Sequence, residues 1–270
     1  MRASVAYNRP ISTGYLHLGL AAPDFPTMFR AGEFVMVRPP WTGDPFLPRA
    51  FSIYRVSGGG GVSPEGPPRI VEILYKVLGK GTQCLARMQP QQEIEILGPL
   101  GNAFTLPDQG VLPVLVAGGI GVPPIAALAR QFRISNFEFR NPEVFLGGKT
   151  SEDILCVKDF EEAGASVHVT TEDGSLGGRG LLTDFLRPFL FTAQVTRLRI
   201  YACGPPGMLT AVARLAEESA VPCEVSVEAN MACGFGACMG CAIEVKADVR
   251  GYKLVCKDGP VFDSREIVWR

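Results

Sequence analysis

The sequence predicts three structural units in series: an antiparallel β-barrel over residues 1–102, a doubly wound α/β domain over 103–222, and a small C-terminal module over 223–270. Three observations support this prediction. Short apolar runs separated by Gly and Pro fill the first unit, strand and helix patterns alternate in the second, and cysteines cluster in the third. A chain of 270 residues is long enough for two domains and a small appendage.

The first unit contains strand-like runs that alternate with Gly and Pro clusters. The runs are Tyr15–Leu20, Phe34–Val37, Phe51–Val56, Arg69–Val77 and Glu93–Leu97. Short strands with such punctuation predict an antiparallel barrel or sandwich. The stretch from Ser57 to Pro68, with four successive glycines and three prolines, is expected to form a long hairpin loop.

Two stretches of this unit are candidates for ligand binding. Arg49 stands just before Phe51 and Ser52 at the start of a strand, a pattern that an exposed strand end also explains. Gly81 and Thr82 lie between a strand and a helical pattern. Free N–H groups and a hydroxyl at a helix start suit a phosphate, although a capped turn would give the same pattern.

The second unit begins with the apolar run Val111–Ala117, as expected for a strand buried on both faces of a parallel sheet. The glycine- and proline-rich turn 118–124 follows, and then the helical pattern Ile125–Phe132. A pyrophosphate can approach bare backbone closely at such a turn. The uncharged stretch between Asp108 and Arg130 has the length of a membrane span, but its glycines and prolines favour strand, turn and helix.

Further strands and helices continue this alternation. The expected strands are Val144–Gly148, Ser166–Thr171 and Arg199–Ala202, and the expected helices are Asp153–Glu162 and Met208–Ser219. Cys203, Gly204 and Pro205 follow the last of these strands. Ligands of doubly wound sheets bind outside the carboxyl ends of the strands, so this turn is expected to face the same crevice as Gly118, although Cys203 also suits a core position.

The third unit contains four cysteines in the pattern C-x4-C-x2-C-x14-C, at Cys233, Cys238, Cys241 and Cys256. This spacing is typical of a [2Fe-2S] cluster, whereas a zinc site would favour two C-x2-C pairs and disulfides would suit a secreted chain. Small residues around the cysteines let a loop wrap a cluster and point its N–H groups inward. Segments 242–246 and 252–256 form a candidate hairpin that returns Cys256 to the loop.

Composition and charge exclude several classes of protein. The formal net charge of −1 gives no reason to expect a nucleic acid or an anionic membrane as a partner. The N-terminus lacks the apolar segment of a secretion signal, so a cytoplasmic location is expected. The chain has two histidines and no hydrolase or zinc-enzyme spacing, so hydrolysis or a zinc active site has little support.

Three segments of the chain together resemble the flavin domain of the ferredoxin-NADP reductase superfamily: residues 49–52, 79–82 and 98–104. The resemblance implies a Greek-key barrel that holds FAD, followed by an NAD(P) site. For the flavin it implies Arg49, Phe51, Ser52, Ile53, Leu74, Tyr75, Lys76, Gly81 and Thr82. For the dinucleotide it implies Gly118, Gly119, Gly121, Cys203, Gly204 and Pro205.

The preference between NAD and NADP depends on charges near the ribose. An acidic group favours NAD, and a basic group accommodates the 2′-phosphate of NADP. Glu172 and Asp173 favour NAD, whereas Lys149 and Arg179 leave NADP open.

Over its whole length the chain resembles the electron-transfer subunits of bacterial NAD-linked dihydroorotate dehydrogenase, of pyrimidine biosynthesis. The cysteine block 231–241 and the segment 257–262 match most specifically. The resemblance implies a heterotetramer of two of these subunits with two FMN-containing dihydroorotate dehydrogenase catalytic subunits, and electron flow through the cluster and FAD to NAD+.

Two other functions stay open. One is an NAD(P)H-ferredoxin reductase subunit of a transhydrogenase or hydrogenase complex, and the other is a non-enzymatic redox sensor. The nearly uncharged cysteine loop, with its Met and Phe residues, suits either an interior segment or a surface that docks on a protein partner, and we favour docking because electrons must leave.

Overall fold

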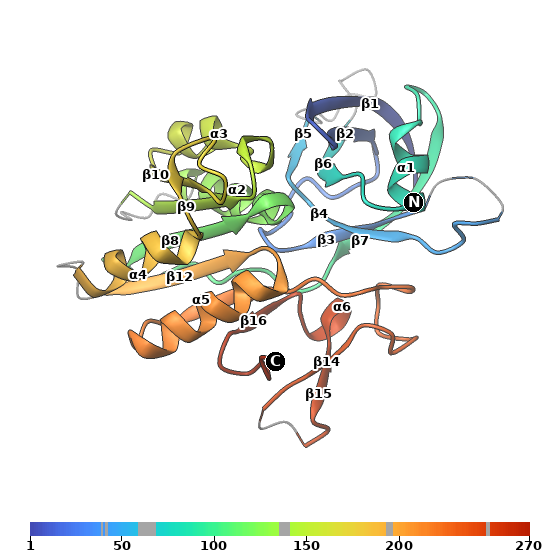
Figure 1. The fold of residues 1–270 in the computed structure, drawn as a ribbon. Coiled ribbons are helices and arrows are strands. Elements are labelled where there is room, and N and C mark those ends of the chain that lie inside the picture. The colour runs from blue at the N-terminus through green and yellow to red at the C-terminus, as the bar shows by residue number, and fades with distance from the viewer. Residues whose placement is uncertain (39, 41–42, 59–68, 135–140, 193–196, 247–248) are drawn as a thin grey trace.

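The computed structural model describes residues 1–38, 40, 43–58, 69–134, 141–192, 197–246 and 249–270. Two seven-stranded sheets and a two-stranded hairpin run through these residues. In Figure 1 the first sheet lies at the upper right, the second sheet lies at the left between its helices, and the C-terminal segment lies below. The three regions follow the order of the predicted units along the chain.

The first sheet is antiparallel throughout, with the strand order β4-β3-β7-β1-β2-β6-β5. Its edge strands β4 and β5 are separated in the chain only by Ile53 and Tyr54, so the sheet curls until its edges meet. This confirms the predicted antiparallel fold. The strands are β1 (Arg2–Ser12), β2 (Tyr15–Ala21), β3 (Phe34–Arg38), β4 (Arg49–Ser52), β5 (Arg55–Ser57), β6 (Ile70–Lys76) and β7 (Glu93–Leu100).

Alternate apolar side chains fill this barrel, because successive residues of a strand point to opposite faces. The core includes Leu18, Leu20, Val71, Ile73, Ile94 and Ile96. Strands β5 and β6 form the expected hairpin, with Ser57 paired to Ile70. Residues 59–68 of the expected loop between them lie outside the part of the chain that the structure describes. Helix α1 (Lys80–Ala86) follows β6 where the sequence predicts a helix.

The second sheet has the order β11-β10-β9-β8-β12-β13-β16, and each neighbouring pair is parallel except β13 with β16. The predicted alternation of strands and helices is confirmed. The strands are β8 (Leu112–Gly118), β9 (Glu143–Gly148), β10 (Ser166–Thr171), β11 (Gly178–Arg179), β12 (Leu198–Cys203), β13 (Cys223–Ser226) and β16 (Val261–Asp263).

Helices cover both faces of this sheet, as a doubly wound fold requires (Figure 1). On β8, Val114 and Val116 pack in the cluster that contains α4 and α5, whereas Leu115 and Ala117 pack in the cluster that contains α2 and α3. The strand is therefore apolar on both faces. The helices are η1 (Gly119–Gly121), α2 (Val122–Ile134), η2 (Ser151–Asp153), α3 (Val157–Glu162), α4 (Leu182–Thr192) and α5 (Pro206–Glu218).

The predicted helix Asp153–Glu162 is wrong in its first part. The short helix η2 ends at Asp153, and α3 begins only at Val157. Ile154 is extended and Cys156 has a left-handed φ of 60°, so the chain turns sharply between the two helices. The Asp153 carboxylate accepts backbone N–H groups of the preceding turn, so it caps the start of η2.

The uncharged stretch after Asp108 forms β8, η1 and α2, as the sequence predicts. Across the described ranges, no helix combines the length and the apolar character needed to cross a membrane.

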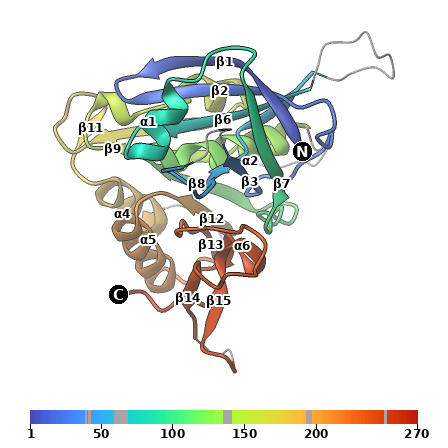
Figure 2. The ribbon, with the colours of Figure 1, turned by 90° about the vertical axis from the view of Figure 1, so that its right-hand side faces the viewer.

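The C-terminal module begins in the second sheet, returns to it, and ends beside the hairpin. The chain leaves β13, forms the cysteine loop and the predicted hairpin of β14 (Ala242–Glu244) with β15 (Tyr252–Leu254), turns through α6 (Val255–Asp258), and returns as β16 beside β13. Figure 2 shows the module below both sheets, with the hairpin at its tip. The module therefore shares a sheet with the second unit.

A network of charged and polar side chains joins the barrel to the second domain. In the barrel, Glu72 contacts His17 at 2.9 Å and Arg55 at 3.9 Å. Arg55 reaches Asp159 of α3 at 3.5 Å, and the Tyr54 hydroxyl donates to the same carboxylate at 2.9 Å. The contact between the two domains is therefore largely electrostatic at this point.

Candidate functional site

Glycine backbones shape the cysteine loop between β13 and β14. Gly234 and Gly236 have φ angles of 82° and 90°, in the left-handed region that favours glycine. A Cβ on Gly234 would lie 2.5 Å from Cγ of Met36, and one on Gly236 would lie 2.9 Å from Cδ of Lys257. The loop therefore needs glycine at both positions for conformation and for space.

The four predicted ligand cysteines lie in two pairs. The sulfur atoms of Cys241 and Cys256 are 3.2 Å apart and buried. The thiol of Cys233 is hydrogen-bonded to the backbone N–H and the side chain of Cys238, which is exposed. All eight cysteines of the chain are free thiols, so the four are available as ligands.

Backbone N–H groups favour the thiolate at the open end of the loop. Burial raises the pKa of Cys233, but N–H groups of Cys238, Phe235 and Ala237 donate to its sulfur and lower the pKa to about 6. Burial and the neighbouring Cys241 raise the pKa of Cys256 to about 12. A bound cation would reverse that effect, because metal ions bind thiolates.

Two thiol pairs with inward N–H groups fit a [2Fe-2S] cluster, in which two cysteines bind each iron. Among the described residues, no three metal-binding side chains converge closely enough for a single metal ion.

A cleft of about 230 Å³ lies where the barrel, the second domain and the module meet; we call it the barrel cleft. Neither Ile53 nor Gly81 lines it: the Ile53 side chain is buried in the barrel core, and Gly81 is buried against Arg49. The other predicted flavin residues do line it. They are Arg49, Phe51, Ser52, Leu74, Tyr75, Lys76 and Thr82.

Local packing places the polar groups of the barrel cleft. A Cβ on Gly81 would lie 2.8 Å from Nε of Arg49, so glycine makes room for the guanidinium. Arg49 donates to the carbonyl of Leu47 at 2.7 Å. The Thr82 hydroxyl accepts the N–H of Leu78 at 2.9 Å and donates to the Gly79 carbonyl at 2.9 Å, so it also caps its own turn.

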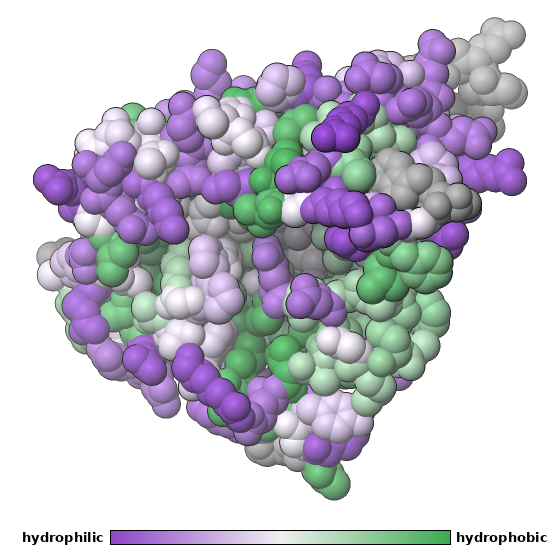
Figure 3. All heavy atoms as spheres, turned by 45° about the vertical axis from the view of Figure 1, so that its right-hand side comes forward, coloured by the Kyte–Doolittle hydropathy of each residue, from purple (hydrophilic) through white to green (hydrophobic). Residues whose placement is uncertain are grey.

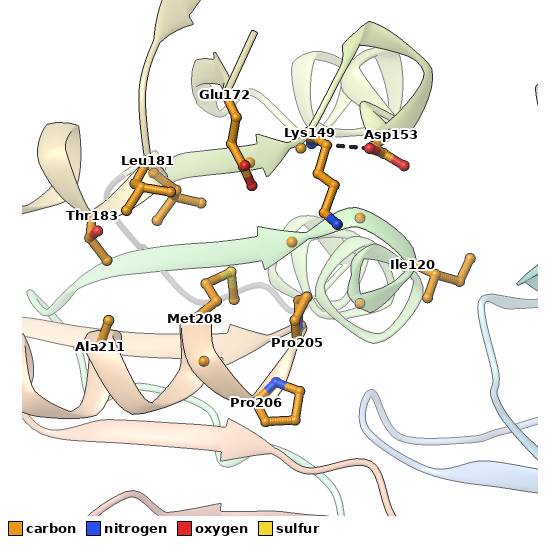
Figure 4. Close-up of a pocket in the computed structure, with 18 of the residues that line it drawn as sticks. Ile120, Lys149, Asp153, Glu172, Leu181, Thr183, Pro205, Pro206, Met208 and Ala211 are labelled. Atoms are coloured by element: carbon orange, nitrogen blue, oxygen red, sulfur yellow. Dashed lines mark hydrogen bonds between the residues drawn. The ribbon is translucent and has the colours of Figure 1, made fainter. Parts of the chain in front are cut away.

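A second cleft, of about 530 Å³, opens at the carboxyl ends of β8, β9, β10 and β12; we call it the sheet-end cleft (Figure 4). Gly118, Gly119 and Gly121 line one side, and Gly204 and Pro205 line another. A Cβ on Gly121 would lie 2.4 Å from the carbonyl oxygen of Cys203. The two predicted turns thus meet in close backbone contact, where a side chain would not fit.

Of the four charged residues considered for the ribose, only Glu172 and Lys149 line the sheet-end cleft. Figure 4 shows both side chains extending into it. Asp173 instead accepts the Ser175 N–H at 2.9 Å outside the cleft. Because one acidic and one basic group line the cleft, the structure is compatible with a preference for NAD and with a preference for NADP.

The two clefts meet and share four lining residues: Lys76, Leu78, Ile120 and Glu228. Cys203 is buried and lines the barrel cleft, while Gly204 and Pro205 line the sheet-end cleft, so one turn of chain contributes to both. Glu228 is exposed toward the clefts, yet the protein packed around it raises the pKa of its carboxyl.

The barrel cleft also reaches toward the cysteine loop. Ala229 and Met231 line it just before Cys233. Glu228, Leu78, Ile120 and Tyr15 are cleft residues that the sequence analysis did not identify, since no local pattern marks them. The three predicted sites thus follow one another: sheet-end cleft, barrel cleft, cysteine loop.

Two family models match the chain. Residues 228–268 match the iron-sulfur cluster binding domain of dihydroorotate dehydrogenase B. Residues 115–214 match the oxidoreductase NAD-binding domain. The first match contains the four cysteines, and the second contains both turns of the sheet-end cleft.

Close relatives extend over nearly the full length. The chain is 36% identical over 249 residues to the dihydroorotate dehydrogenase B (NAD(+)) electron transfer subunit of Desulforamulus reducens, covering 92% of this chain and 90% of the relative. It is 36% identical over 269 residues to the same subunit of Bacillus caldolyticus, covering 99% and 98%.

Solved structures share the fold. The structure of an NADH-dependent reduced ferredoxin-NADP oxidoreductase superposes with a TM-score of 0.81 at 25% identity, covering 99% of this chain and 90% of the other. The ferredoxin reductase of carbazole 1,9a-dioxygenase superposes with a TM-score of 0.66 at 23% identity, covering 82% of this chain and 66% of the other, which supports the fold alone.

Proposed function

Because this chain belongs to the family of electron-transfer subunits of NAD+-linked dihydroorotate dehydrogenase B, we propose that it passes electrons from dihydroorotate oxidation through a [2Fe-2S] cluster and FAD to NAD+. The observation that carries the proposal is the order of the three sites. The barrel cleft opens into the sheet-end cleft on one side and reaches the cysteine loop on the other.

The residues of each site fit the group proposed for it. Cys233, Cys238, Cys241 and Cys256 would hold the cluster, and backbone N–H groups donate to the sulfur atoms of Cys233 and Cys241. Arg49 supplies a cation for the flavin pyrophosphate, with Phe51 and Tyr75 packed beside it, their ring centroids 5.8 Å apart. Bare backbone at Gly119 and Gly121 receives the dinucleotide phosphates.

When bound, FAD supplies the conversion between single electrons at the cluster side and a hydride at the nicotinamide side. The chain itself binds and orients the cofactors and excludes water from them, and no side chain need act as a nucleophile. Glu172 in the sheet-end cleft favours NAD+ over NADP+ through the ribose hydroxyls.

The partner proposed is an FMN-containing catalytic subunit, two copies of each chain forming the complex. It would dock on the apolar surface at the cysteine loop, where the exposed fractions of whole residues are 59% for Phe235, 45% for Met239 and 44% for Leu97. A hollow of about 400 Å³ adjoins Cys233 there. Figure 3 shows apolar surface gathered on the side of the molecule that carries this loop. Exposed apolar area of this kind marks protein contacts.

The test is dihydroorotate-dependent reduction of NAD+ by the co-expressed complex, compared with each subunit alone. We expect turnover only in the complex. A silent complex whose electron-transfer subunit still reduces a ferredoxin with NADPH would contradict the proposal. That result would favour the ferredoxin-linked alternative, for which Lys149 in the sheet-end cleft is the supporting feature.

A further inference from the structure

The carboxylate of Asp153 joins the two domains where the clefts meet. Its Oδ1 atom accepts the Tyr15 hydroxyl and, at 2.9 Å, the Lys76 ammonium, both from the barrel. Its Oδ2 atom accepts the backbone N–H groups of Lys149 at 3.0 Å and Thr150 at 3.3 Å, both from its own domain. Figure 4 shows the bond to Lys149. Oδ1 therefore accepts hydrogen bonds from the barrel, and Oδ2 accepts them from the second domain.

The groups that Asp153 holds are walls of the clefts. Lys76 lines both clefts, and Tyr15, Lys149 and Asp153 itself line the sheet-end cleft. The backbone of Lys149 continues directly from β9, at whose carboxyl end the cleft opens. Displacing this one carboxylate would therefore shift the cleft residues of the barrel, Tyr15 and Lys76, relative to Lys149 of the second domain.

The packing around Asp153 leaves little freedom. Only 12% of its side chain is exposed. A Cβ on Gly148 would lie 2.8 Å from the Cβ of Asp153, so glycine permits this close approach. Next to it, Glu152 accepts the Thr13 N–H at 3.1 Å, and its carbonyl accepts the Ser12 hydroxyl at 2.8 Å. The β1–β2 turn is thus fastened to η2 at adjacent residues.

The link is charged at neutral pH. Burial alone would raise the pKa of Asp153, but the hydrogen bonds from Tyr15 and Lys76 lower it to about 2. Hydrogen bonds to an ionised acceptor are roughly twice as strong as neutral ones. The carboxylate therefore acts as a fixed ionic bridge between the domains.

We propose that Asp153 is a positioning residue for hydride transfer. It fixes the position of the sheet-end cleft relative to the barrel cleft, so that nicotinamide and flavin stack at reacting distance. The inference rests on the proposed function. Hydride transfer depends steeply on alignment, and a misplacement of about 1 Å lowers a rate up to about 100-fold.

The test is the variant Asp153→Asn in the co-expressed complex, loaded with its cofactors. Asparagine keeps the size of the side chain but removes the charge and replaces one acceptor oxygen by a donor. We expect flavin reduction by NADH, followed anaerobically by stopped flow, to slow about tenfold. The NADH dissociation constant should change less than about twofold, and the long-wavelength absorbance of the stacked nicotinamide and flavin should weaken.

Two further variants make the result specific. Tyr15→Phe removes one O–H donor to Oδ1 and keeps the ring, so it should slow the same step by a smaller factor. Glu161→Gln removes an exposed charge from α3 and should leave the step unchanged. Wild-type rates in Asp153→Asn, or loss of FAD from both Asp153→Asn and Tyr15→Phe, would overturn the inference. A wild-type complex without any NADH-driven flavin reduction would contradict the proposed function as well.

Discussion

The cysteine loop and the junction of the two clefts are held by different means. In the loop, left-handed glycines and backbone N–H groups from within a few residues fix the sulfur of Cys233. At the junction, side chains far apart in the chain meet, as when the Tyr15 hydroxyl reaches Asp153. The loop is built by backbone conformation, and the junction is built by charge.

This difference separates what each region controls. Damage to the loop should remove the cluster and leave FAD in place, because the four cysteines lie in the loop and α6, outside the lining of the barrel cleft. Damage to the junction should leave every cofactor in place and change the rate or the acid stability. Two substitutions in the loop, one in the charged contact at Glu72 and one in the sheet-end cleft test these expectations.

The largest effect is expected from Cys238→Ser. A serine hydroxyl is a poor replacement for a thiolate ligand, so iron content and dihydroorotate-dependent NAD+ reduction should fall to near zero, while FAD and NADH-driven dye reduction are retained. Iron analysis and absorbance spectra measure this. Cys84→Ser, which replaces a cysteine outside the loop, is the control. Loss of FAD together with iron would show that the two sites are not independent.

A second effect follows from Gly234→Ala. The left-handed φ and the overlap with Met36 should together destabilise the loop by about 2 to 4 kcal/mol, which lowers cluster retention on mild heating. Gly207→Ala is the matched control, since a Cβ there meets nothing within 4 Å. Equal iron loss in the two variants would contradict a backbone origin for the shape of the loop.

The second charged contact between the two domains, which runs from Glu72 through Arg55 to Asp159, should be sensitive to acid. Burial alone would raise the pKa of Glu72, but hydrogen bonds from His17 and Ser57 and the charge of Arg55 lower it from 4.5 to about 2. A lowered pKa contributes stability that is present above pH 4.5 and is lost as the pH falls towards 2. Over that range the wild type should lose about 2 kcal/mol more unfolding free energy than Glu72→Gln. Urea unfolding at several pH values measures this, and parallel curves would be evidence against a stabilising charge on Glu72.

The smallest effect is expected from Glu172→Gln. Removing the carboxylate from the sheet-end cleft should shift the preference between NADH and NADPH about 5- to 10-fold towards NADPH, through weaker recognition of the ribose hydroxyls. Asp173→Asn, which changes a residue outside the cleft, should leave the ratio unaltered. The measurement is the ratio of kcat/KM for NADH to kcat/KM for NADPH in both variants, and an unchanged ratio in Glu172→Gln would contradict a role of Glu172 in recognising the ribose.

The predictability of the two regions follows from the same distinction. The cysteine spacing and the glycine turns at 118–121 and 204 are contiguous, so the sequence alone indicated them, and the structure brings the turns together. The bridge at Asp153 depends on residues 77 and 138 positions away, and no local pattern encodes it. Helix α4 escaped prediction because Pro188 lies inside it, and a proline normally ends a helical pattern.

The return of β16 to β13 has a consequence for engineering. Ser226 and Val261 are paired across these strands, so the whole cysteine-bearing segment leaves and re-enters the sheet at neighbouring points. A two-residue turn is the commonest way to join two such antiparallel positions. Replacing the segment by that turn should keep the sheet but remove Glu228, Ala229 and Met231 from the wall of the barrel cleft. An iron-free variant that still binds FAD therefore has to retain residues 227–231 and be shortened after them.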